Sequence, residues 1–301
     1  TAVGAVKPIE MEEIMGYRIG FDIGSTTIKA VVLDGNNQIC YKSYERHKAQ
    51  VRQKALDKLV ELKKYTKEPF KFAISGSGAL GLCEQGELPF VQEVFASATG
   101  VSKLYPETDC AIELGGEDAK ILFFQGSVEQ RMNSTCAGGT GAFIDQMATL
   151  LNMSLEELNE ASLNYHRLYP IASRCGVFAK TDIQPLINQG VDKCDLCASI
   201  FQAVVDQTIT SLAQGRKIEG NILFLGGPLY FLSGLRKRFV ETLKLSDAQV
   251  NCPETAINFV ALGTSICADQ EYTYDELYKA LEDLVHAPAK LTESIPLFEN
   301  E

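Results

Sequence analysis

Two short segments of the sequence share one pattern that is suited to binding phosphate groups. The segments are GFDIGSTTIKAVVLDG at residues 20–35 and AIELGGEDAKILFFQG at residues 111–126. Their chemically similar positions, always 91 residues apart, are Asp22 with Glu113, Gly24 with Gly115, Lys29 with Lys120 and Gly35 with Gly126. Each copy has the pattern of a strand ending in an acidic residue, a turn of small residues and a second strand. The joint match predicts a duplicated fold with a cleft between its halves.

The turn residues explain how such a hairpin would hold a nucleotide. Gly, Ser and Thr leave successive backbone N–H groups accessible, so the turns at residues 24–27 and 115–116 can cradle phosphates. Asp22 and Glu113 stand at the strand ends, where a carboxylate can hold a hydrated Mg²⁺. A third turn, Gly226-Gly227, follows a buried strand and offers exposed backbone to a nucleoside. Because Walker A and Rossmann glycine patterns are absent, the sequence favours a site divided between two domains.

The hydrophobic pattern predicts the elements that position these turns in an α/β fold. Strands are expected at 17–23, 28–33, 38–44, 70–75, 110–114, 119–124 and 221–225. Helices are expected at 50–65, 142–151, 196–215, 229–243 and 273–285, and a capping-box pattern at Ser154 opens another. We expect a leader at 1–15, a first subdomain of 16–109 plus about 260–286, a second of 110–259, and a tail or linker at 287–301.

Composition limits the classes of function. The 301 residues are 46% hydrophobic and 22% charged, which suits two ordinary globular domains. A net charge of −11, without a run of Lys and Arg, argues against nucleic-acid binding. No apolar run approaches the roughly 20 residues that span a bilayer, and the start of the chain does not have the pattern of a signal peptide. Nine cysteines without a regular disulfide spacing, in a chain with no predicted export signal, indicate a reducing, cytoplasmic location. We expect no membrane partner, because no apolar run is long enough to span a bilayer.

Several motifs resemble those of known proteins. DIGST at 22–26, ELGGE at 113–117 and LGG at 225–227 are similar to the phosphate 1, phosphate 2 and adenosine motifs of the acetate and sugar kinase, Hsp70 and actin superfamily. MNSTCAGGTGAFID at 132–145 and SRCGVFA at 173–179 resemble the activators of 2-hydroxyacyl-CoA dehydratases in the BadF/BadG/BcrA/BcrD ATPase family. The resemblance covers about residues 17–270 and is greatest to the first activator module of long fused activase proteins.

The resemblance implies duplicated RNase H-like, actin-like ATPase domains that close on MgATP in an interdomain cleft. The residues that would bind ATP or ADP are Gly24, Ser25, Thr26, Thr27, Lys29, Gly115, Gly116, Gly138, Gly139, Thr140, Gly226, Gly227 and Pro228. Asp22 and Glu113 would organise the metal, and Glu117 would position the attacking water. The family usually has Asp-Ile-Gly-Gly-Gln at the second phosphate motif, so Glu113 and Glu117 give this chain a longer carboxylate and an added charge.

The same resemblance implies a homodimer that shares one [4Fe-4S] cluster through Cys136 and Cys175 of each subunit. A cluster of this type needs four thiolates, so two per subunit require a two-fold axis. The family's electron donor is a reduced ferredoxin or flavodoxin. ATP-driven movement then passes a low-potential electron to a 2-hydroxyacyl-CoA dehydratase or benzoyl-CoA reductase-like iron–sulfur partner, either separate or fused in a longer chain.

The other cysteines and the histidines carry no predicted chemistry. Cys194 and Cys197 form a C-x-x-C at the start of a predicted helix, with no second pair at zinc-site spacing, so we interpret them as helix residues. The residues predicted to lie in the core are Cys40, Cys83, Cys110, Cys252 and Cys267. The residues without a partner at ligand spacing are His47, His166 and His286.

Two other functions fit the nucleotide motifs. A small-molecule kinase of the N-acetylhexosamine type would not need Cys136 and Cys175. It would need an Asp base aimed at a sugar hydroxyl, for which Asp145 and Asp182 are candidates. A nucleotide-sensing module would bind ATP without turnover and regulate the segments to which it is fused. An ATPase assay separates the sensor from the two enzymes.

Overall fold

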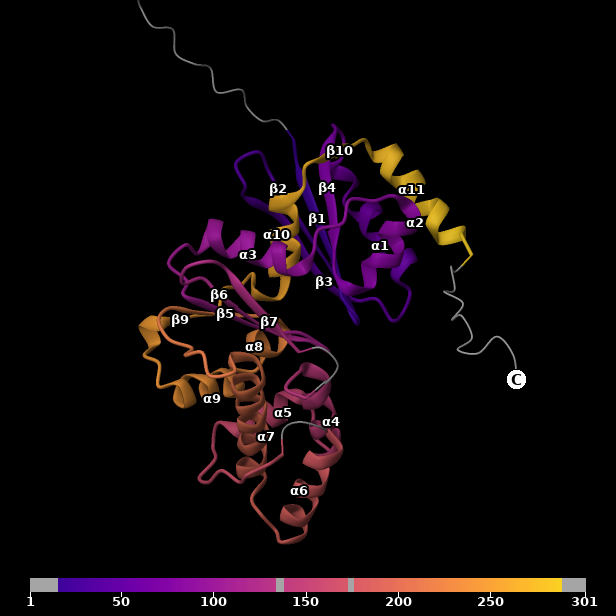
Figure 1. The fold of residues 1–301 in the computed structure, drawn as a ribbon. Coiled ribbons are helices and arrows are strands. Elements are labelled where there is room, and N and C mark those ends of the chain that lie inside the picture. The colour runs from indigo at the N-terminus through magenta and orange to yellow at the C-terminus, as the bar shows by residue number, and fades with distance from the viewer. Residues whose placement is uncertain (1–15, 134–137, 173–175, 289–301) are drawn as a thin grey trace, which may run out of the picture.

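A computed structural model describes residues 16–133, 138–172 and 176–288 of the chain. Two five-stranded sheets form an upper and a lower lobe (Figure 1). The upper sheet has the order β10-β4-β1-β2-β3, with β1 at Arg18–Ile23, β2 at Thr27–Leu33, β3 at Ile39–Arg46, β4 at Phe70–Ser75 and β10 at Gln270–Tyr272. The lower sheet has the order β7-β6-β5-β8-β9, with β5 at Cys110–Leu114, β6 at Ala119–Phe123, β7 at Glu129–Met132, β8 at Ile222–Leu225 and β9 at Val250–Asn251.

The two sheets repeat one topology, which confirms the predicted duplicated α/β fold. β1 pairs antiparallel with β2 and parallel with β4, and β5 pairs in the same way with β6 and β8. The hairpin turns also match, since Gly24 N donates to Thr27 O at 2.9 Å and Gly115 N to Asp118 O at 2.8 Å. The two sheets differ in the direction of one edge strand. In the upper sheet β10 runs antiparallel to β4, whereas in the lower sheet β9 runs parallel to β8.

Helices cover both sheets. Those placed mainly with the upper lobe are α1 at Val51–Glu61, α2 at Leu80–Gly86, α3 at Glu93–Leu104, α10 at Phe259–Cys267 and α11 at Tyr274–His286. Those in the lower lobe are α4 at Gly141–Leu151, α5 at Leu155–Ser162, α6 at Gly176–Asn188, α7 at Lys193–Thr208, α8 at Gly227–Phe231 and α9 at Ser233–Leu243. In Figure 1, α1, α2 and α11 lie on one side of the upper sheet, and α3 and α10 lie on the other. The predicted capping box is present, since Ser154 Oγ accepts from Glu157 N at 3.1 Å.

Each lobe has its own apolar core, and a third apolar cluster joins them. The joining cluster includes Val31 of β2, Ala111 of β5, Leu223 of β8 and Phe259 of α10. Helix α10 packs closely here, because a side chain on Gly263 would collide with the backbone of α3 at Ala96. The two phosphate-type hairpins are therefore carried by sheets that share a packed centre. The domain boundaries expected from the sequence stay a prediction.

Three predicted helices differ from the structure in their ends. The helix expected at 50–65 ends at Glu61 and continues as the 3-10 turn Lys63–Tyr65. The helix expected at 229–243 is two helices, α8 and α9, separated at Leu232, whose ψ of 90° is not helical. The helix expected from 196 begins at Lys193, because the Asp192 side chain accepts from Cys194 N and caps it.

Helix α7 continues into the π-helical segment Ile209–Ala213. The combined helix, Lys193–Ala213, has 21 residues and is long and apolar enough to cross a membrane by length and composition alone. The sequence predicted a helix at 196–215 but no apolar run long enough to cross a membrane. Of its most apolar window, 72% is buried inside the protein, so we interpret it as a core helix of the lower lobe.

The structure corrects one cysteine prediction. Cys83 and Cys110 are buried as expected and Cys252 and Cys267 are partly buried, but Cys40 is exposed on β3. β3 is an edge strand, so its side chains alternate between partly buried and exposed rather than entering a core. Cys197 is buried in α7, where burial raises the pKa of its thiol to about 12. A buried, protonated thiol agrees with the interpretation of Cys197 as a helix residue.

Candidate functional site

A cleft of about 890 Å³ lies between the two sheets and is lined by both lobes. The upper lobe contributes predicted residues Asp22, Gly24, Ser25, Thr26, Thr27 and Lys29. The lower lobe contributes predicted residues Glu113, Gly115, Gly116, Glu117, Gly226, Gly227 and Pro228. Residues from three separate regions of the sequence are thus brought to one cavity, whose volume is in the range that holds a small-molecule ligand or cofactor.

The two hairpin turns face each other across this cleft. A Cβ atom on Gly116 would lie 3.1 Å from Thr26 Oγ1 and 3.9 Å from Ser25 Oγ. Glycine therefore permits a close approach at which a larger side chain would crowd Thr26. Ser25 and Thr26 are exposed, so their hydroxyl and backbone groups are available to a ligand in the cleft.

Helix α4 supports the second turn directly. Gly141 N donates to Gly115 O at 3.0 Å, and Ala142 N donates to Gly116 O at 2.7 Å. Both helix residues also line the cleft, a position that the sequence did not assign to them. Of the described residues predicted to bind nucleotide, only Gly138, Gly139 and Thr140 do not line it. They precede α4, where Gly139 has a φ of +82° and packs against Gln207 of α7.

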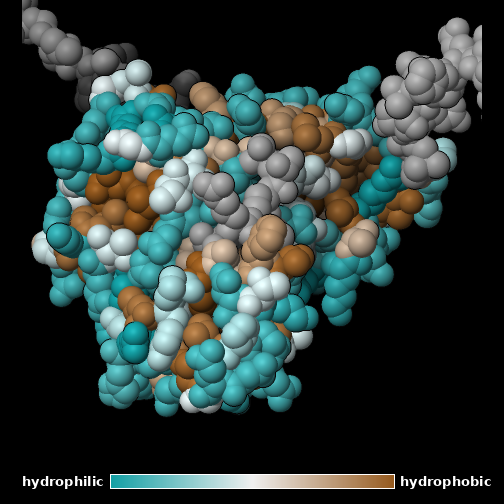
Figure 2. Space-filling model, turned by 60° about the horizontal axis from the view of Figure 1, so that its bottom comes forward, coloured by the Kyte–Doolittle hydropathy of each residue, from teal (hydrophilic) through white to brown (hydrophobic). Residues whose placement is uncertain are grey.

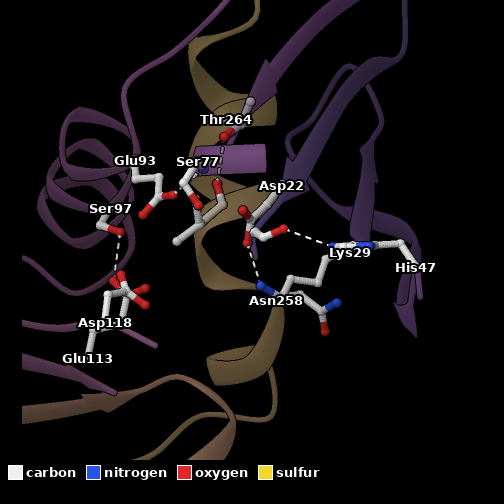
Figure 3. A network of polar contacts seen from close by, with 12 residues as sticks. Asp22, Lys29, His47, Ser77, Glu93, Ser97, Glu113, Asp118, Asn258 and Thr264 are labelled. Carbon is white, nitrogen blue, oxygen red and sulfur yellow. Dashed lines mark hydrogen bonds and ion pairs between the residues drawn. The ribbon is translucent and has the colours of Figure 1, made fainter. Parts of the chain in front are cut away.

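The upper hairpin carries a buried ion pair. Lys29 Nζ donates to Asp22 Oδ2 at 2.7 Å between directly paired positions of β2 and β1 (Figure 3). Burial by itself would lower the pKa of Lys29, but the attraction of Asp22 and their hydrogen bond outweigh it, so the pKa is raised. Lys29 therefore remains charged next to the first phosphate-type turn.

The lower hairpin carries a larger charge cluster. Lys120 Nζ lies 2.6 Å from Asp118 Oδ2 and 3.5 Å from Glu113 Oε1, and it also contacts Glu93. Ser97 Oγ donates to Glu113 Oε2 at 3.2 Å. Burial would lower the pKa of Lys120, but the three carboxylates raise it well above its usual value. The pKa of Glu113 is raised by burial, against the opposing effect of Lys120.

Glu93 is a cleft residue that the sequence analysis missed. It opens α3 in the upper lobe, accepts a hydrogen bond from Ser77 N at 2.8 Å and reaches Lys120 of the lower lobe. Figure 3 shows Glu93 on the same side as Ser97, Glu113 and Asp118, with Asp22 and Lys29 opposite. Glu93 therefore links the two lobes at the cleft. The only sequence signal was an acidic residue in a helix's first turn, which is too common to indicate a site.

The donor set suits a metal that arrives with a nucleotide better than a metal held by protein alone. Among the described residues there is no group of three His, Cys, Asp or Glu side chains arranged around a metal position. Mg²⁺ in nucleotide sites uses one or two carboxylates together with waters and phosphate oxygens. Asp22 and Glu113 line the cleft and can serve in that way. Cys136 and Cys175, the predicted cluster ligands, lie outside the described residues.

The two residues that the sequence offered as a base for a sugar hydroxyl lie at different sites in the structure. Asp145 of α4 lines the cleft. Asp182 of α6 instead accepts a hydrogen bond from Ala172 N at 2.7 Å and lines a second hollow in the lower lobe.

Two lobes of one topology, with facing hairpin turns in a shared cleft, define an actin-like ATPase fold. The sequence matches the BadF/BadG/BcrA/BcrD ATPase family over residues 19–268, and the chain belongs to this family. Both the family and the fold class predicted from the motifs are confirmed.

Individual relatives agree with this assignment. The chain is 27% identical over 215 residues to the (R)-2-hydroxyglutaryl-CoA dehydratase activating ATPase of Acidaminococcus fermentans, covering 70% of this chain and 82% of the relative. It is 25% identical over 164 residues to one of the subunits of benzoyl-CoA reductase from Thauera aromatica, covering 52% of this chain and 58% of the relative.

Solved structures show the same fold. The crystal structure of the Acidaminococcus fermentans (R)-2-hydroxyglutaryl-CoA dehydratase component A matches with a TM-score of 0.75 and 26% identity, covering 89% of this chain and 99% of that one. The activator of the 2-hydroxyisocaproyl-CoA dehydratase from Clostridium difficile, with bound ADPNP, matches with a TM-score of 0.73 and 25% identity, covering 91% and 100%.

Proposed function

We propose that this protein hydrolyses ATP in the cleft and activates a 2-hydroxyacyl-CoA dehydratase or benzoyl-CoA reductase-like partner by supplying an electron. The observation that carries the proposal is the close approach of two equivalent turns, at residues 24–27 and 115–118, each backed by a lysine–carboxylate pair. Membership of an ATPase family and the ADPNP in the similar Clostridium difficile structure support the nucleotide. The activator relatives support the class of partner.

Each side chain in the cleft has a proposed task. Backbone N–H groups of the two turns, with the Ser25 and Thr26 hydroxyls, would bind the phosphates. Asp22 and Glu113 would orient Mg²⁺, which when bound neutralises charge that develops on the phosphates. Glu117, which is exposed in the cleft, would position the attacking water. The start of α8, at residues 226–228, would lie against the nucleoside.

The described flanks of the two cysteine segments lie on one pair of helices. Gly176, which opens α6, packs against the Gln146 side chain of α4. Val177 and Phe178 follow it and are 69% and 64% exposed. Figure 2 views this end of the molecule and shows apolar patches among largely hydrophilic side chains. Exposed apolar groups of this kind are typical of protein contacts and suit a second copy of the chain.

We therefore propose that Cys136 and Cys175 of two subunits hold one [4Fe-4S] cluster, with a reduced ferredoxin or flavodoxin as donor. When bound, the cluster supplies a low-potential electron. The chain itself would couple the nucleotide site to the cluster, because the first N–H groups of α4 donate hydrogen bonds directly to the carbonyl groups of Gly115 and Gly116. A shift of the second phosphate turn during turnover would therefore move α4 and the segment before it.

The first experiment is anaerobic purification followed by iron, sulfide and molecular-mass analysis. We expect about four irons per dimer, the content of one [4Fe-4S] centre, and their loss in Cys136→Ala and in Cys175→Ala. Cys40→Ala, at an exposed position on β3, is the matched control and should retain the iron. Absence of iron after anaerobic reconstitution, or iron that persists in both variants, would overturn the cluster proposal.

One observation keeps the kinase alternative testable. Asp145 lines the cleft, where it would serve as the base for a sugar hydroxyl if the protein were a kinase. ATP turnover that requires an added N-acetylhexosamine and is lost in Asp145→Asn would favour the kinase. ATP binding without turnover, with or without a sugar, would favour a sensor. Turnover that is independent of sugar agrees with the activator.

A further inference from the structure

We propose that His47 is a positioning residue for the first phosphate-binding turn, at residues 24–27. Its imidazole would hold the Gly24 carbonyl so that the turn presents its N–H groups to a phosphate. The inference rests on the nucleotide site of the proposed function but does not depend on the cluster or the partner. His47 follows β3, outside the motifs, and its sequence neighbours predict no role for it.

His47 contacts the turn through both its side chain and its backbone. The residue is only 4% exposed, and its Nε2 lies 3.0 Å from Gly24 O. Its backbone N donates to Thr26 O at 3.2 Å, which extends the β2–β3 pairing beyond the strand. Two polar groups of the turn are thus held by one residue.

The hydrogen bonds define the tautomer of the ring. Ala49 N lies 3.2 Å from His47 Nδ1, and a backbone N–H can only donate. Nδ1 must therefore be the unprotonated nitrogen, which leaves the hydrogen on Nε2. That hydrogen is donated to the Gly24 carbonyl. The ring thereby connects the Gly24 carbonyl to the loop that precedes α1.

The backbone after His47 adopts a costly conformation. Lys48 and Ala49 have φ angles of 50° and 61°, in the left-handed region that residues with a Cβ rarely occupy. Each such residue brings its Cβ too close to the following carbonyl oxygen, which is unfavourable. The turn closes through a bond from Gln50 N to His47 O at 2.8 Å. Strain of this kind persists where the surrounding contacts require it, here the insertion of His47 behind the phosphate turn.

The duplicated fold provides an internal comparison. Gly115 occupies the position in the lower hairpin that Gly24 occupies in the upper one. Its carbonyl accepts a hydrogen bond from Gly141 N, at the start of α4, at 3.0 Å. In the upper lobe, α1 begins only at Val51 and the His47 side chain supplies the donor instead. The same carbonyl is held in both halves by different chemistry, which indicates that holding it matters to the turn.

Holding this carbonyl also orients a neighbouring donor. The peptide between Gly24 and Ser25 is planar and trans, so its C=O and N–H point in opposite directions. With the C=O directed at His47, the Ser25 N–H points away from the ring. Ser25 lines the cleft, so this N–H is a donor that His47 can orient for a phosphate.

Two amide substitutions test the roles of the two ring nitrogens of His47 separately. In His47→Gln the amide nitrogen can reach the position of Nε2 and donate to Gly24. In His47→Asn the shorter amide can replace only the Nδ1 acceptor. His166→Gln, at an exposed loop position of the lower lobe, is the matched control. Dissociation constants would be measured by calorimetry for ADPNP and, separately, for adenosine.

We expect His47→Asn to weaken ADPNP binding about tenfold, the scale of one lost hydrogen bond, with adenosine affinity unchanged. His47→Gln should stay within about threefold of wild type, since the donor to Gly24 is restored. Unchanged ADPNP affinity in His47→Asn, or an equal loss for ADPNP and adenosine, would overturn the inference. An ADPNP affinity of His47→Gln that is no higher than that of His47→Asn would also overturn it.

The tautomer is tested without any nucleotide. With three histidines in the chain, long-range ¹H–¹⁵N correlation spectra can be assigned by comparison with the variants. We expect an unprotonated Nδ1 and a protonated Nε2 for His47, and the reverse would overturn the inference even if the Asn variant fails to fold. Failure to activate a partner, with ADPNP binding and the tautomer as expected, would instead count against the proposed function alone.

Discussion

Replacing Lys120 by Met should destabilise the protein strongly at neutral pH. The Lys120 side chain is 2% exposed and faces Glu113, Asp118 and Glu93. Methionine preserves most of the apolar volume of the lysine side chain. It removes the positive charge, which is the only one that the described ion pairs place among these three carboxylates. The variant would therefore leave Glu113, which is itself buried, beside two groups of like charge.

The magnitude follows from the geometry. At the 3.5 Å between Lys120 Nζ and Glu113 Oε1, two unit charges attract by about 5 kcal/mol at an effective dielectric constant of about 20, before desolvation is counted. Measured losses on removing one partner of a buried pair are about 3–5 kcal/mol, and we expect a loss in that range. Asp118 is 38% exposed and adds less because water screens it. As a control, Lys237→Met removes an exposed pair 3.9 Å long and should cost at most about 1 kcal/mol.

The loss should depend on pH in a defined direction. Because the folded pKa of Lys120 lies above its unfolded value, its contribution is complete at neutral pH and is lost only as pH rises through that folded pKa. The folded pKa of Glu113 is already raised by burial and would rise further without Lys120. A carboxyl with a raised folded pKa favours the folded state when protonated. The variant should therefore regain stability relative to wild type as pH falls from neutral toward that raised pKa.

Urea unfolding followed by circular dichroism, at neutral pH and at mildly acidic pH, measures both effects. Adding Glu113→Gln to Lys120→Met should recover part of the loss, since it removes the buried like charge. Wild-type stability of Lys120→Met at neutral pH would refute the reasoning. So would a deficit that is the same at both pH values.

Two further predictions concern the cleft and a helix end. Gly116→Val should weaken ATP binding at least about tenfold, or 1.4 kcal/mol, because its side chain would meet Thr26, whereas Gly81→Ala, with open space around it, should bind normally in the same titration. Equal affinities would show that the turns can separate freely. Ser154→Ala should lower the free energy of unfolding by about 1 kcal/mol, measured by urea unfolding, because Glu157 N loses its cap acceptor. No change would mean that this helix end frays in the native protein.

The parts of the site that depend on local chemistry could be predicted from the amino-acid sequence. In each hairpin the acidic residue and the lysine seven positions later lie opposite each other, as Asp22 with Lys29 and Glu113 with Lys120, so these pairs depend on local strand and turn geometry. Turn residues and a repeat at one offset then predicted the duplicated fold. These features are local, because strand alternation and turn geometry depend on neighbouring residues alone.

The distant residues that complete the cleft could not be predicted in this way, because they meet only in the folded protein. Glu93 meets Lys120 from 27 residues away, and His47 meets Gly24 from 23 residues away. Neither contact follows from spacing, because each depends on how α3 and the loop after β3 pack against a sheet. The exposure of Cys40 likewise depends on β3 being an edge strand. Interiors are closely packed, so the partners of such residues depend on how distant elements fit together and become visible only in the assembled fold.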